Sequence, residues 1–129
     1  MLLVYSMIYL HSEALRDKYM RYEYLKQNLV FMKIVRVQYT TTAEYAATNK
    51  ENINNIVREL NELNHPGIKY SCYVLEDGKT FMHLDHFENE EAHEVLTSLE
   101  SFKKFLTELW ASSLEKEPKL ELLSPVAAT

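Results

Sequence analysis

The sequence predicts one α+β domain of βαββαβ order, in which an antiparallel sheet carries two helices on one face. Two observations lead to this prediction. Strand-like and helix-like apolar patterns alternate in that order between Met32 and Val126. The pair Asp77-Gly78 separates two strand-like runs, and such a pair supplies the positive φ angles of a tight hairpin turn. With 47% apolar residues among 129, the chain can bury a core, and a single domain is expected.

The first half of the domain is predicted as a strand followed by a helix. Residues 33–39 are rich in Val and Ile, as strands are. Thr48 and Glu51 have capping-box spacing just before an apolar run of helical period, which predicts that a helix starts there. The segment Asn64-His65-Pro66-Gly67 ends this helix, because proline cannot continue it and glycine tolerates the turn. Strand alternation places Ile34, Arg36 and Gln38 on one face of the first strand, and Val35, Val37 and Tyr39 on the other.

The second half is predicted as a hairpin, a helical region and a last strand. Residues 68–75 and 80–87 are the hairpin strands. Asn89 can cap a short helical turn, and Ser98 can cap the longer helix that follows. Pro118 stops the helical region, and the last strand covers residues 120–123. The apolar positions of the longer helix are Leu99, Phe102, Phe105, Leu106, Leu109 and Trp110.

The sheet face that the helices leave open raises a physical problem. Two helices cover only one side of four strands, yet the second and third strands are apolar or aromatic at positions of both parities. Such a face would be a large apolar patch, which soluble monomers rarely expose. The sequence therefore predicts a twofold homodimer in which two sheets face each other. In the second strand, one face carries Ile68, Tyr70, Cys72 and Val74, and the other carries Tyr73 and Leu75. In the third strand, one face carries Phe81 and Phe87, and the other carries Met82 and Leu84.

Charge and cysteine content exclude several classes of function. The chain has 14 Lys plus Arg against 19 Asp plus Glu, a net charge of −5, and no basic block, so nucleic-acid binding is not expected. Cys72 is the only cysteine, which excludes an internal disulfide and a paired-cysteine metal site and indicates a reducing cytoplasm. The apolar run of residues 1–10 is too short to span a bilayer, so no membrane partner is expected.

Residues 1–31 differ in character from the rest, and two interpretations stay open. In the first, an amphipathic helix over about residues 13–29 packs on the domain or on a partner. In the second, Met32 is the initiator, and the residues before it come from an upstream start. The expected organisation is an N-terminal extension over residues 1–31, the domain over residues 32–126, and a tail over residues 127–129.

Residues 65–109 carry four motifs in a fixed order. A Pro-Gly pair opens the second strand, an aromatic–Glu pair closes the third, an acidic turn follows, and an aromatic-rich helix comes next. The motifs are Pro66-Gly67, Phe87-Glu88, Asn89-Glu90-Glu91-Ala92 and Ser101-Phe102-Lys103-Lys104-Phe105. By these motifs the chain resembles the dimeric α+β barrel superfamily of ferredoxin-like folds, and within it the antibiotic biosynthesis monooxygenase branch.

The resemblance implies a ligand pocket between the sheet and the helices of each protomer, and chemistry without a bound cofactor. It places Gln38 where oxygenases of this branch often have Asn, and Phe87 where many have Trp. Haem-degrading members carry a His on the last helix where this chain has Leu106, so the resemblance argues against haem. The superfamily mixes oxygenases, haem-degrading enzymes and isomerases, so the fold alone does not fix the activity.

His83 and Asp85 are the predicted catalytic pair. The strand period of two puts them on one face and His86 on the other, so the two histidines cannot jointly hold a metal ion from this strand. His83 would act as a base, and Asp85 would orient it. The structural alternative is that both are polar linings, paired with Arg36 or with groups on the helices.

Five more side chains are predicted to line the ligand site. Arg36 can hold an anionic group, with a salt bridge to Asp85 or to a helix Glu as the structural alternative. Tyr70, like Tyr73, can donate a hydrogen bond to a substrate oxygen, with packing in the strand and a hydroxyl at the rim as the structural alternative. Trp110 either lines the pocket or fills the core. Gln38 and Phe87 complete the set through the resemblance.

The expected function is a small cytoplasmic homodimer that binds a small, partly aromatic or unsaturated molecule and acts on it, if at all, without a cofactor. A metabolite-binding dimer without catalysis and an acid–base isomerase are the alternatives. Outside the site, His93 is expected at the surface, and so are the asparagines of the first helix, Asn52, Asn54 and Asn55.

Overall fold

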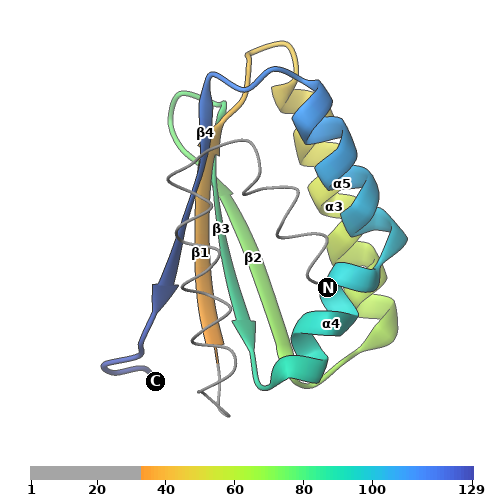
Figure 1. Ribbon diagram of the computed structural model, residues 1–129, viewed down its shortest axis with the longest axis vertical. Helices are drawn as coiled ribbons and strands as arrows, with labels where there is room; N and C mark the ends of the chain where they lie inside the picture. Colours follow the sequence, from red (N-terminus) through yellow and green to blue (C-terminus); the bar gives the residue numbers. More distant parts are fainter. Residues whose placement is uncertain (1–32) are drawn as a thin grey trace.

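The computed structural model describes residues 33–129, which form a four-stranded antiparallel sheet with helices on one face (Figure 1). The order of elements confirms the predicted βαββαβ arrangement, with the second helical region divided in two. The predictions for residues 1–31 lie outside the described residues. The elements are β1 (Lys33–Thr40), α3 (Ala46–Leu63), β2 (Ile68–Val74), β3 (Thr80–Phe87), α4 (Glu90–Ser98), α5 (Glu100–Ala111) and β4 (Lys116–Leu123).

The sheet has the strand order β2-β3-β1-β4, so β1 and β3 are central and β2 and β4 are edges. In the β1–β3 ladder Val37 pairs with His83, and Arg36 pairs with Leu84. Cross-strand partners share a face of a sheet. Odd-numbered residues of β1 and β3 therefore face the helices, and even-numbered ones face away from them. We call these the helix face and the open face.

The hairpin between β2 and β3 follows the predicted turn chemistry. Gly78 has a φ of 74°, which glycine adopts without strain. The Asp77 carboxylate accepts hydrogen bonds from the backbone N–H groups of Lys79 (3.0 Å) and Thr80 (2.8 Å). These bonds fix the turn, and the turn fixes the register of the two strands.

Helix α3 begins earlier than predicted. Its first helical residue is Ala46, and the Thr42 hydroxyl accepts a hydrogen bond from the Tyr45 N–H at 3.2 Å. Thr48 therefore lies inside the helix, and the predicted capping box is wrong. The predicted end is confirmed: Asn64 adopts the left-handed conformation (φ 51°), and its N–H donates to the Leu60 carbonyl.

The second helical region consists of α4, whose N-terminus is capped as predicted, and α5, whose first turn is bonded by a side chain distant in the sequence. Asn89 caps α4, because its side-chain oxygen accepts from the Ala92 N–H at 2.9 Å. Ser98, however, ends α4 and does not cap α5. Near the start of α5 the Ser101 N–H donates to the Glu59 carboxylate of α3 (3.2 Å), a tertiary contact that no local pattern reveals.

Pro118 lies inside β4, although the sequence predicted a last strand that begins after it. An edge strand tolerates proline because one of its sides donates no ladder hydrogen bonds. Within residues 33–129, β4 pairs only with β1, and its register shifts between Gln38 and Thr40, close to the proline. The edge position and this irregularity together accommodate Pro118.

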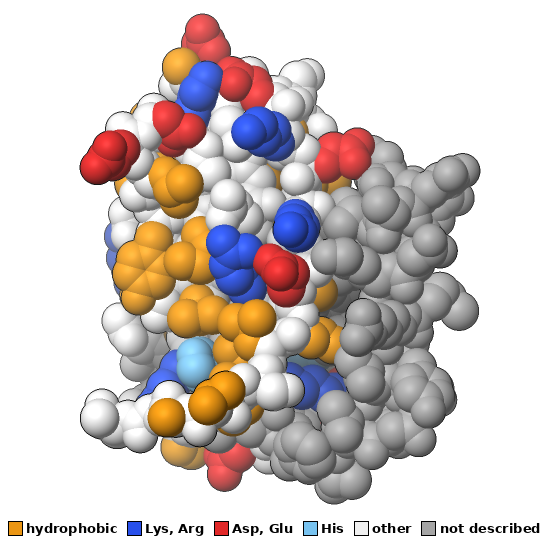
Figure 2. All heavy atoms as spheres, turned by 90° about the vertical axis from the view of Figure 1, so that its left-hand side faces the viewer, with side chains coloured by type: hydrophobic (Ala, Val, Ile, Leu, Met, Phe, Trp, Pro, Cys, Tyr) orange, Lys and Arg blue, Asp and Glu red, His pale blue; other side chains and the backbone are white. Residues whose placement is uncertain are grey.

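The open face mixes apolar and charged side chains (Figure 2). Hydrophobic groups gather near its middle, around a few Lys, Arg and acidic side chains. Tyr73, Leu75 and Leu123 are 53%, 44% and 38% exposed, which is high for residues of this size. In residues 33–129, moreover, no helix is long and apolar enough to cross a membrane.

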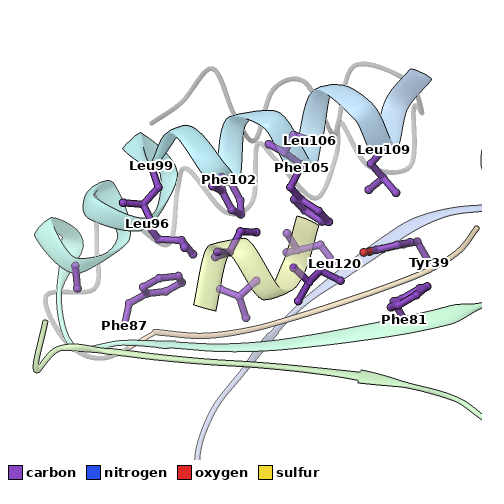
Figure 3. Packing of buried hydrophobic residues seen from close by; sticks show 14 of the residues in the cluster. Tyr39, Phe81, Phe87, Leu96, Leu99, Phe102, Phe105, Leu106, Leu109 and Leu120 are labelled. Atoms are coloured by element: carbon purple, nitrogen blue, oxygen red, sulfur yellow. The ribbon is translucent and has the colours of Figure 1, made fainter. Parts of the chain in front are cut away.

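The core lies between the helix face and the helices α3, α4 and α5 (Figure 3). His93, predicted at the surface, is fully buried there, with its ring centroid 4.7 Å from that of Phe87. Asn52, also predicted at the surface, is buried and donates to Glu108 at 3.1 Å. The largest apolar side chains that are fully buried are Phe81, Phe87, Ile56, Leu96, Leu106 and Leu109.

Candidate functional site

The helix face carries two polar residues in the middle of an apolar layer. His83 and Asp85 lie on β3 between the buried rings of Phe81 and Phe87, and they are only 4% and 6% exposed. The strand period predicted that the two share a face, and they do. Burial of polar groups at this depth is unfavourable unless they find hydrogen-bond partners. Their partners therefore decide what this site can do.

Both ring nitrogens of His83 are hydrogen-bonded to tyrosines from neighbouring strands. Its Nε2 lies 2.7 Å from the Tyr39 hydroxyl of β1, and its Nδ1 lies 2.9 Å from the Tyr70 hydroxyl of β2. Tyr39 in turn accepts a hydrogen bond from the Asn49 Nδ2 of α3 at 2.9 Å. We call Asn49, Tyr39, His83 and Tyr70 the relay. It runs from the helix layer across three strands, and the Phe105 ring packs on its histidine.

Burial keeps His83 in its neutral form. Burial lowers the pKa of His83 to about 3, because the apolar surroundings disfavour an imidazolium. Burial likewise raises the pKa of Tyr39 and Tyr70 well above its usual value. At neutral pH all three side chains are therefore uncharged.

Asp85 does not orient His83, as the predicted catalytic pair required. No hydrogen bond joins the two, since both histidine nitrogens are engaged by tyrosines. The Asp85 Oδ1 is buried and has no hydrogen-bond partner among the described residues. Burial raises the pKa of Asp85 well above its usual value, so this carboxyl group is disposed to be protonated. The geometry does not support a histidine base with an orienting carboxylate.

A hollow of about 160 Å³ lies between the C-terminal half of α3 and the edge strand β2. Tyr70 is one of its walls, so the last member of the relay reaches it. Of the predicted site residues only Tyr70 lines this hollow. The other lining residues are Val57, Leu60, Asn61, Asn64, His65 and Ile68.

Arg36 and Gln38 lie on the open face, on the other side of the sheet from His83. The Arg36 guanidinium donates to Glu121 of β4 and to the Gln38 side-chain oxygen, each at 2.6 Å. The grouping of Arg36 with the catalytic pair is therefore wrong, and its salt-bridge partner is neither Asp85 nor a helix Glu. Both residues line a separate hollow of about 260 Å³ next to β4.

The remaining predicted residues belong to the core or its margin. Phe87 is fully buried and lines neither hollow. Trp110 is half-buried and packs on the core. Burial raises the pKa of the Cys72 thiol to about 12, which suits the expected inert packing role. Among residues 33–129, no group of three or more potential ligands is placed to hold a metal ion.

Tyr39 and Asn49 are the relay members that sequence reasoning missed as site residues. Strand alternation places Tyr39 on the same face as Val35 and Val37, but it gives the tyrosine no role. Asn49 precedes Ile53 and Ile56 by four and seven residues, the spacing of one helix face. A polar residue in register with a buried apolar stripe is a usable signal, and here it points to the hydrogen bond with Tyr39.

Comparison with known proteins gives structural matches only. No protein-family model matches the chain, and no curated protein matches its sequence. A proposed antibiotic biosynthesis monooxygenase from Caulobacter crescentus CB15 superposes with a TM-score of 0.66 at 16% identity, covering 83% of this chain and 99% of that one. Another antibiotic biosynthesis monooxygenase gives a TM-score of 0.61 at 14% identity, with coverage of 74% and 99%.

A mutant of SnoaB, a cofactor-independent oxygenase from Streptomyces nogalater, superposes with a TM-score of 0.57 at 11% identity, covering 75% of this chain and 95% of that one. Identities this low establish a shared fold and leave activity open. This chain therefore has the ferredoxin-like α+β fold of the antibiotic biosynthesis monooxygenase structures, a fold that forms dimeric α+β barrels.

Proposed function

We propose that this protein is a homodimer that binds a small molecule in the hollow between α3 and β2, where the ligand meets the Tyr70 hydroxyl. One observation carries the proposal: Tyr70 both lines the hollow and ends a buried chain of hydrogen bonds through His83. A fold of this kind needs no polar chain through its core, because apolar residues would fill the same space at lower cost. Polar groups that break the local packing rules are typical of functional sites.

The chemistry available at the hollow is hydrogen bonding by Tyr70, oriented by the relay. His83 has no free nitrogen with which to take a proton from a ligand. The likeness to SnoaB supports extending the proposal to oxygenation without a bound cofactor. In this extension Tyr70 holds an oxygen atom of the substrate, and the relay fixes the direction of the Tyr70 hydroxyl.

A binding protein without catalysis is the second candidate, and the hollow's lining favours it. Among the described residues that line the hollow, only His65 has the character of a base. Its Nδ1 accepts from the Gly67 N–H at 3.0 Å, and its Nε2 lies 2.8 Å from Glu91. The acid–base isomerase has less support, because it requires the His83–Asp85 pair that the geometry separates.

The binding proposal predicts a Tyr70-dependent thermal shift. In a ligand library, compounds that bind the native protein raise its melting temperature, and Tyr70→Phe should lose most of this rise. Tyr73→Phe is the matched control, because Tyr73 lies on the same strand but faces away from the hollow. Equal shifts in wild type and Tyr70→Phe, for every compound that binds, would contradict the proposed site.

The homodimer is proposed through the open face, and charge introduction tests it. Leu84 lies on this face beside Arg36 in the ladder, so Leu84→Lys places two cations together in the expected interface. We expect wild type to sediment as a dimer at micromolar concentration and Leu84→Lys as a monomer. Leu63→Lys, the same change at an exposed site on α3, should remain a dimer. A monomeric wild type would contradict the proposed assembly.

A further inference from the structure

The relay has a direction, which follows from the donors and acceptors that its members own. The Asn49 Nδ2 atom only donates, so Tyr39 accepts at this end of the relay. The Tyr39 hydroxyl then has one proton to give, and the Nε2 of His83 is 2.7 Å away. A neutral imidazole that accepts at Nε2 carries its proton on Nδ1. That N–H donates to the Tyr70 hydroxyl oxygen at 2.9 Å.

Tyr70 is thus left with a hydroxyl proton and no acceptor among the described residues. Its only hydrogen bond there is the one it receives from His83. The neighbouring Asp85 is not bonded to it, and the Asp85 Oδ1 has no partner in that part of the chain. A half-buried donor without an acceptor is unfavourable. The hollow that Tyr70 lines is where an acceptor can be supplied.

The other walls of the hollow carry no formal positive or negative charge from Lys, Arg, Asp or Glu. Val57, Leu60 and Ile68 are apolar, and Asn61 and Asn64 are uncharged amides. His65, the remaining described wall residue, has both ring nitrogens engaged, one by the Gly67 N–H and one by Glu91. A carboxylate or phosphate entering here would therefore lose water without gaining a lysine or arginine partner, and an ammonium group would gain no free carboxylate. The hollow's volume of about 160 Å³ is room for about five water molecules. A ligand with a ring of about six atoms suits this volume.

We propose that the hollow selects an uncharged ligand with a hydrogen-bond acceptor, such as a cyclic ketone, which Tyr70 recognises as a donor. This inference rests on the proposed function, because it names the ligand class of the same hollow. It replaces the expectation that Arg36 binds an anionic substrate, since Arg36 lies on the opposite face and already pairs with Glu121.

The first test reads the direction of the relay without any ligand. In ¹⁵N-labelled full-length protein, long-range ¹H–¹⁵N spectra identify which nitrogen of His83 carries the proton. We expect the proton on Nδ1. A proton on Nε2 would mean that the Asn49 amide is turned and that Tyr70 donates to His83. Tyr70 would then have no proton for a ligand, and the inference would be overturned while the hollow kept its place in the proposed function.

The second test compares three probes of one shape: cyclohexanone, cyclohexanecarboxylate and cyclohexylammonium. Each probe is titrated into the protein, and binding is followed by the NMR chemical shifts of residues that line the hollow. The ketone should bind at least about 10-fold more tightly than either charged probe. Tyr70→Phe should weaken ketone binding by about 3- to 10-fold, the effect of one hydrogen bond, and Tyr73→Phe should not. Tighter binding of either charged probe would overturn the ligand class and leave the binding site standing. If none of the three probes bound, the proposed ligand class would also be overturned. The thermal-shift screen of the ligand library would then test the proposed function separately.

Discussion

Phe87→Ala is expected to lower the free energy of unfolding by about 3–5 kcal/mol. Phe87 is 0% exposed and packs on the buried ring of His93. Alanine would remove the apolar contacts of the ring and leave a cavity that the sheet and α4 cannot fully close. Since domains of this size are stable by about 5–15 kcal/mol in total, the variant should be near the limit of folding.

Urea denaturation at one protein concentration measures this loss, because the stability of a dimer depends on concentration. Phe87→Leu should cost less, since leucine keeps most of the buried volume. Leu63→Ala, at a side chain that is 52% exposed, should change the stability by no more than about 0.5–1 kcal/mol. If Phe87→Ala cost as little as this control, the ring would not be a core element.

Most of the fold was predictable because its determinants are local. Asp77-Gly78 specifies the hairpin by backbone conformation alone, and Asn64 and Pro66 end α3 for the same kind of reason. The errors at Thr48 and Ser98 have the opposite origin. Any suitable oxygen nearby can cap a helix, and at α5 it comes from Glu59, 42 residues before Ser101.

The site was predictable only in part, because it depends on which strand faces align. Alternation within one strand assigns His83 and Asp85 to one face, but it does not say which face of β1 joins them. A register shift of one residue exchanges the faces. Arg36 was therefore grouped with His83, whereas the actual partner of His83 across the β1–β3 ladder is Val37. The bracketing aromatics Phe81 and Phe87 were the available signal, since large rings of one parity indicate the core side.

Asp85→Asn is expected to change how stability depends on pH, more than any other single carboxyl replacement in the described domain. Burial raises the pKa of Asp85 in the folded protein, while in the unfolded chain it is about 3.9. Between these two values the folded protein holds a proton that the unfolded chain has released. The free energy of unfolding therefore falls as pH rises through this window, by up to about 1.4 kcal/mol per pH unit. The contribution is restored when the pH is lowered towards 4.

Asparagine cannot titrate, so the stability of Asp85→Asn minus that of wild type should rise as the pH rises above about 4, the pKa of Asp85 in the unfolded chain. The extra amide N–H groups of the variant shift this difference by a constant, which leaves its slope interpretable.

Asp77→Asn is the control of opposite sign. Hydrogen bonds, first that from the Thr80 hydroxyl, lower the pKa of Asp77, so its contribution is present above the unfolded pKa and is lost in acid. For Asp77→Asn the corresponding difference should fall as pH rises through the acid range below about 4, where the lowered pKa of Asp77 places its titration. Parallel curves for wild type and Asp85→Asn would mean that Asp85 is ionised in the folded state.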